Sequence, residues 1–60
     1  MNKLAVGRAI VELNNVVSEI DEEMCAGIID EVPHFSSRLN HLKQLRATVR
    51  DTIANLKREL

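Results

Sequence analysis

One short segment, Pro33-His34-Phe35-Ser36-Ser37, separates two long stretches of helical pattern and most constrains the fold. Proline has no amide hydrogen to donate, and it pushes the preceding residue out of the helical region. A first helix is therefore expected to end near Glu31. Ser36 or Ser37 then offers a hydroxyl to the free amides of a second helix. Helices joined by so short a connection usually pack antiparallel against each other.

Apolar residues before this segment recur three and four residues apart, which is the spacing of one helical face. Ala9 and Val16 widen this stripe on one flank. After Met24 the apolar positions are Ile28, Ile29 and Val32, so the stripe is expected to rotate around the helix. The seam of the first stretch consists of Val6, Ile10, Leu13, Val17, Ile20 and Met24.

The second stretch has the same helical spacing, with one interruption. Arg46 occupies the seam position between Leu42 and Val49, with Leu45 beside it. A charge on an apolar seam lowers stability unless it is paired, although polar seam residues often fix helix register. The apolar seam residues here are Leu39, Leu42, Val49, Ile53, Leu56 and Leu60. The sequence thus predicts a single all-α domain over residues 1–60, an antiparallel two-helix hairpin with helices at about 3–32 and 37–60 and a hinge at 33–36.

The length of 60 residues is near the lower limit for a chain that folds alone. Ordering costs roughly 1.5 kcal/mol per residue, so an isolated hairpin of this size has a net stability near zero. The single cysteine, Cys25, allows no internal disulfide. We therefore expect self-association, with a dimeric four-helix bundle as the first choice. Its predicted oligomer core consists of Ile10, Leu13, Val17, Ile20, Met24, Val49, Ile53 and Leu56.

Charges are divided unevenly between the two halves. Residues 1–35 carry two basic and seven acidic side chains, a net charge of -5, and residues 36–60 carry six basic and two acidic, a net charge of +4. An antiparallel hairpin allows these charges to meet. The expected pairs are Arg38 with Asp30 or Glu31, Arg46 with Glu22 or Glu23, Arg50 with Glu19, and Lys57 or Arg58 with Glu12.

No catalytic or cofactor-binding motif is present, so we expect no enzyme activity, no cofactor and no metal. His34 and His41 match no established ligand spacing and are interpreted as ordinary loop and surface residues. Gly27 is expected to permit close approach between helices, with a local kink as the alternative interpretation. Cys25 is expected to behave as a small buried hydrophobe, although it also suggests a redox link between two copies.

A row of basic residues on the second stretch is the strongest functional lead. Lys43, Arg50 and Lys57 are spaced by seven and share one helical row, which Arg46 borders. One hypothesis is binding of RNA or DNA through this row. Another is sequestration of a small anionic ligand at a subunit interface by Arg46, Arg50 or His41. The balanced net charge of -1 favours a third interpretation, in which acids of the first helix neutralise the row.

The absence of a signal-type segment and of an 18-residue apolar stretch predicts a cytoplasmic protein with no membrane contact. Its small size is typical of bacterial or viral proteins. The main functional prediction is a non-enzymatic interaction or regulatory protein. It is expected to bind itself and a macromolecular partner, most simply another protein.

Overall fold

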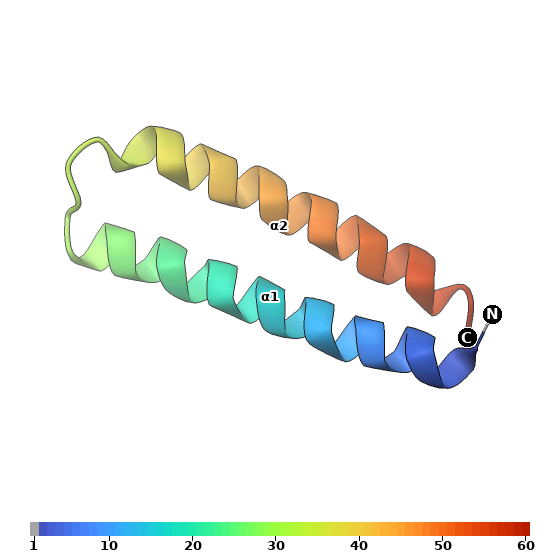
Figure 1. Cartoon of the computed structure of the whole chain (residues 1–60). Helices are drawn as coiled ribbons and strands as arrows, with labels where there is room; N and C mark the ends of the chain where they lie inside the picture. The colour runs from blue at the N-terminus through green and yellow to red at the C-terminus, as the bar shows by residue number, and fades with distance from the viewer. Residues whose placement is uncertain (1) are drawn as a thin grey trace.

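The chain folds into two helices that lie side by side and run in opposite directions (Figure 1). The computed structural model describes residues 2–60, in which α1 spans Lys3–Ile29 and α2 spans Phe35–Lys57. The hairpin is elongated, with extents of 45 × 15 × 9 Å. The predicted all-α hairpin is confirmed, and no strand occurs within the part of the chain that is described.

Helix α1 ends earlier than the proline suggests. Glu31 has a φ of 50°, in the left-handed region. The amide of Glu31 donates to the carbonyl of Ile28 at 3.2 Å, and the amide of Val32 donates to the carbonyl of Gly27 at 3.1 Å. These two bonds form a Schellman motif, which satisfies the last carbonyls of the helix. The prediction that α1 continues to residues 31–32 is wrong, because this motif stops the helix at Ile29 before Pro33 is reached.

Helix α2 also begins earlier than expected. His34, at φ 58°, precedes it and makes no side-chain capping hydrogen bond. Ser36 and Ser37 lie inside the first turn, so the prediction that one of them caps α2 is wrong. The chain has already reversed direction over residues 30–34, and Phe35 is the first helical residue. At the other end α2 stops at Lys57, and Leu60 lies beyond it with 56% of its surface exposed.

The core between the helices consists of two apolar clusters. The cluster distant from the turn contains Val6, Ile10, Val17 and Ile53, with Leu13, Val49 and Leu56 packed against it. The cluster nearer the turn contains Ile20, Met24 and Leu42, with Phe35 and Leu39 packed against it. All eight residues predicted for the oligomer core thus take part in packing within one hairpin. Their role in contacts between copies stays a prediction.

Gly27 continues the seam at the turn end of α1. It is buried, and the ring of Phe35 occupies the space where a Cβ would lie. The expected close approach is therefore confirmed at Gly27, with an aromatic ring as the approaching group. The expected rotation of the stripe is wrong, because Ile28, Ile29 and Val32 are 58%, 77% and 44% exposed. A large ring fits over the glycine and leaves no room on the seam for these branched side chains.

Candidate functional site

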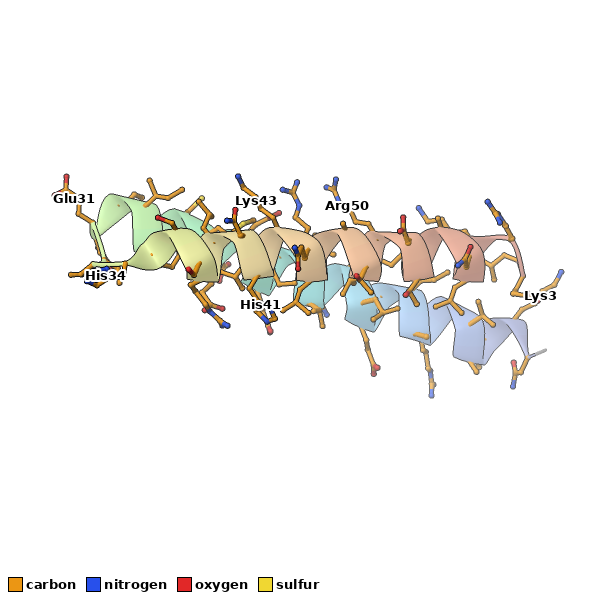
Figure 2. All side chains as sticks on the ribbon, turned by 90° about the horizontal axis from the view of Figure 1, so that it is seen from above. Lys3, Glu31, His34, His41, Lys43 and Arg50 are labelled. Carbon is orange, nitrogen blue, oxygen red and sulfur yellow. The ribbon has the colours of Figure 1, made fainter. Side chains whose placement is uncertain are left out.

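Two ion pairs connect the helices, one along each edge of the hairpin. Arg38 Nη2 lies 2.7 Å from Glu23 Oε1, and Arg46 Nε lies 3.3 Å from Asp21 Oδ1. Arg46 is within one helical turn of Lys43 and Arg50, whereas Arg38 is within one turn of His41. Figure 2 shows Lys43 and Arg50 projecting along one edge and His41 projecting from the other.

We call these surfaces the basic edge and the acidic edge. The basic edge consists of Lys43, Arg46, Arg50 and Lys57 of α2, with Asp21 of α1. The acidic edge consists of Glu12, Val16, Glu19 and Glu23 of α1, with Arg38, His41 and Leu45 of α2. Membership follows from helical spacing, because residues three, four or seven apart share a row on a helix.

The observed ion pairs differ from the expected ones. Arg38 pairs with Glu23 instead of Asp30 or Glu31, because the chain already reverses over residues 30–34 and these two acids lie in the turn and not on α1. Arg46 pairs with Asp21 instead of Glu22 or Glu23.

The other expected pairs do not form. Within residues 2–60, neither Arg50 with Glu19 nor Lys57 or Arg58 with Glu12 forms an ion pair. The helix phase explains this result, since Glu12 and Glu19 share a row with Glu23 on the acidic edge.

The basic edge contains an open concavity lined by Lys43, Arg46, Ala47 and Arg50. The side chain of Arg46 is 34% exposed, but its Nε is buried and makes no hydrogen bond to the described residues. Arg46 and Asp21 therefore attract each other through their charges, but the Nε–H of Arg46 is not directed well enough at the carboxylate to form a hydrogen bond. Lys43, Arg50 and Lys57 form no ion pair with any acid among residues 2–60. The expected neutralisation of the row by α1 is limited to the pair at Arg46.

A second hollow adjoins the basic edge and is mainly apolar. Met24, Cys25, Ile28 and Leu39 line it, together with the polar residues Asp21, Lys43 and Arg46. Cys25 is exposed, so the expectation of a buried cysteine is wrong. The residue follows Met24, which holds the seam position, and one residue along a helix turns the side chain about 100° away from the partner helix.

The acidic edge contains an apolar strip that both helices share. Val16 precedes Glu23 by seven residues, and Leu45 follows Arg38 by seven. Because Glu23 and Arg38 are paired, this spacing brings Val16 and Leu45 to the same level, two turns further from the chain reversal. They are 38% and 39% exposed. Partly buried members of the first cluster continue the strip, namely Leu13, Val49 and Leu56.

The structure separates one predicted site residue from the others. His41 lies on the acidic edge, so a single hairpin does not bring it together with Arg46 and Arg50 around one small anion (Figure 2). The sequence spacing could have predicted this separation, because His41 is three residues after Arg38 and four before Leu45 and so shares their side of the helix. No group of three histidine, cysteine or acidic side chains in the described part of the chain is placed to hold a metal ion.

Comparison with known proteins gives no functional assignment. No protein-family model matches the chain, and neither a curated protein nor a solved structure is significantly similar to it. Among the described residues, neither helix combines the length and apolarity that a membrane span requires.

Proposed function

We propose that this hairpin is a non-enzymatic interaction protein whose working form is a dimeric four-helix bundle that binds a macromolecular partner. The observation that carries the proposal is the apolar strip around Val16 and Leu45 on the acidic edge. It runs across both helices and is continuous with the core, as expected of a surface that a second copy covers.

The energetics of the single hairpin support association. Within residues 2–60, only seven apolar side chains are buried, and of these only Leu42 is fully enclosed. Apolar burial contributes about 25 cal/mol per Å² removed from water, against roughly 1.5 kcal/mol of ordering entropy per residue. Covering the strip with a second copy removes Val16, Leu45 and the outer faces of Leu13, Val49 and Leu56 from water. Association therefore adds stabilising apolar burial, and no further residues have to be ordered in either copy.

Sedimentation equilibrium combined with thermal unfolding tests the proposal. A dimer should be present at micromolar concentration, and the unfolding midpoint should rise with protein concentration, because association stabilises the folded state by mass action. A monomer with a midpoint independent of concentration would overturn it.

The proposed interaction role also needs a surface that the bundle leaves accessible. Lys43 and Arg50 project from the edge opposite His41, and His41 shares a helical row with Leu45 (Figure 2). A dimer formed through Val16 and Leu45 therefore leaves the basic edge exposed. Each bundle then presents two basic edges, one from each copy.

A further inference from the structure

We propose that the basic edge binds the phosphate backbone of double-helical nucleic acid. The inference rests on the proposed interaction role and names the chemical class of the partner. Three features of the edge support it: three of its four cations have no ion-pair partner within residues 2–60, its cations are arranged in a line, and it has no aromatic side chain.

The charge of the basic edge is available to a ligand. Lys43, Arg50 and Lys57 have no ion-pair partner within residues 2–60, and Asp21 pairs only with Arg46. Although the net charge of the chain is -1, most acids of α1 are on the acidic edge or the outer face of that helix. A polyanion that approaches along the basic edge therefore meets four cations and one carboxylate.

The arrangement of the cations fits an extended polyanion. Lys43, Arg50 and Lys57 recur every seven residues, about 10.5 Å apart along the helix, and together span about 21 Å. A small anion requires cations that converge on one point, whereas this row presents them in a line. Arg46 lies between Lys43 and Arg50 in the same open concavity, and its side chain is 34% exposed. Guanidinium groups are well suited to phosphate oxygens.

The absence of stacking groups favours a duplex over a single strand. Proteins that bind single strands usually combine cations with aromatic side chains on which bases stack. Phe35 is the only aromatic residue of the chain, and its ring is packed over Gly27 at the turn. The basic edge therefore contacts the backbone and not the bases, so binding should show little sequence preference.

Fluorescence anisotropy with labelled DNA and RNA duplexes of about 20 base pairs tests the proposal. Neutralising three to four phosphates predicts an affinity that falls about 40- to 150-fold between about 50 and 200 mM salt. The two duplexes distinguish the source of the phosphate backbone, and tight binding of either one supports the proposal. No salt-dependent binding of either duplex at micromolar protein would overturn it.

Charge-matched variants locate the contact. Lys43→Gln, Arg50→Gln and Lys57→Gln should each weaken binding about three- to tenfold and lower the salt slope by about one. Arg38→Gln removes the same charge from the acidic edge and should change affinity less than about twofold. An equal loss with Arg38→Gln would show a general charge effect and overturn the site.

Competition and sedimentation separate the remaining outcomes. A polyglutamate peptide at equal charge concentration should displace the duplex weakly, and stronger binding of the peptide would assign the edge to an acidic protein and overturn the inference. Displacement of the duplex by micromolar inorganic phosphate would assign the edge to a small anion and would also overturn the inference. A stable dimer that binds no duplex would leave the proposed bundle intact and remove this inference alone, whereas a monomer would remove the bundle.

Discussion

The two edges of the hairpin are formed by the same two helices but differ in chemistry. Along the acidic edge, Glu12, Glu19 and Glu23 border an apolar strip, and Arg38 is the cation that pairs there. Along the basic edge, four cations share one acid, Asp21. Opposite net charges on neighbouring helices thus do not neutralise each other, because the rotation of each helix decides which side chains meet.

The two ion pairs show the same contrast in detail. Arg38 donates two hydrogen bonds to Glu23 Oε1, at 3.0 and 2.7 Å, and both side chains are about half exposed, at 50% and 47%. Arg46 is more enclosed, yet its buried Nε makes only a 3.3 Å ionic contact. The better-formed pair therefore lies on the edge with surplus acid. The less complete pair lies where we propose that phosphate binds.

The largest effect is expected at the apolar strip of the acidic edge. Leu45→Glu should raise the dissociation constant of the dimer at least about 100-fold, because burying an unpaired carboxylate costs several kcal/mol. Analytical ultracentrifugation measures this change. Val11→Glu adds the same charge at a position that is 61% exposed and belongs to neither edge, so it should leave assembly unchanged. Equal dissociation by both variants would show that the strip is not the interface.

A smaller effect, and a stabilising one, is expected from a substitution on the basic edge. Arg46→Leu should raise the free energy of unfolding by about 1 to 2 kcal/mol, because leucine fills an apolar seam and removes a partly buried charge. Asp21 is 44% exposed, so water solvates its carboxylate when the arginine is gone. Urea unfolding of this variant and of the exposed control Arg50→Leu measures the difference. A marked loss of stability in Arg46→Leu would show that the arginine is required for the fold.

The sequence predicted the two helices and their seams because apolar spacing reports directly on which helical face is buried. Seam residues such as Ile10, Val17 and Ile53 are buried as expected. The partial burial of Arg46 beside a 39% exposed Leu45 also agrees with the predicted phase of α2.

The register between the helices was not predictable in the same way. It depends on the chain reversal, in which Glu31 and His34 adopt left-handed conformations that are uncommon for residues other than glycine. Packing of Phe35 over Gly27 then fixes which residues face each other. The earlier reversal moved the partners of Arg38 and Arg46 along α1, whereas the rotation of α1 keeps Glu12 and Glu19 away from the basic row.

Asp21 is the one acid on the basic edge, so replacing it tests whether the local charge of this edge controls duplex affinity. Asp21→Asn removes its one paired acid and should raise duplex affinity about two- to fivefold at low salt, since one repulsive charge is lost. Glu19→Gln makes the same charge change on the acidic edge and should have little effect on affinity. Anisotropy titrations of the two variants measure the contrast. Equal gains would mean that only the net charge of the protein matters and not the edge.

The smallest effect is expected at the pair between Arg38 and Glu23. Both side chains are about half exposed, so solvent screens their attraction and ordering two long side chains offsets part of the gain. A double-mutant cycle of Arg38→Ala and Glu23→Ala should give a coupling free energy of about 0.3 to 1 kcal/mol that decreases with added salt. The same cycle on Arg46 and Asp21 should give a coupling no larger, since that contact lacks a hydrogen bond. A clearly larger coupling at Arg46 would mean that the basic edge already satisfies its own charge, which removes the reason for a phosphate ligand there.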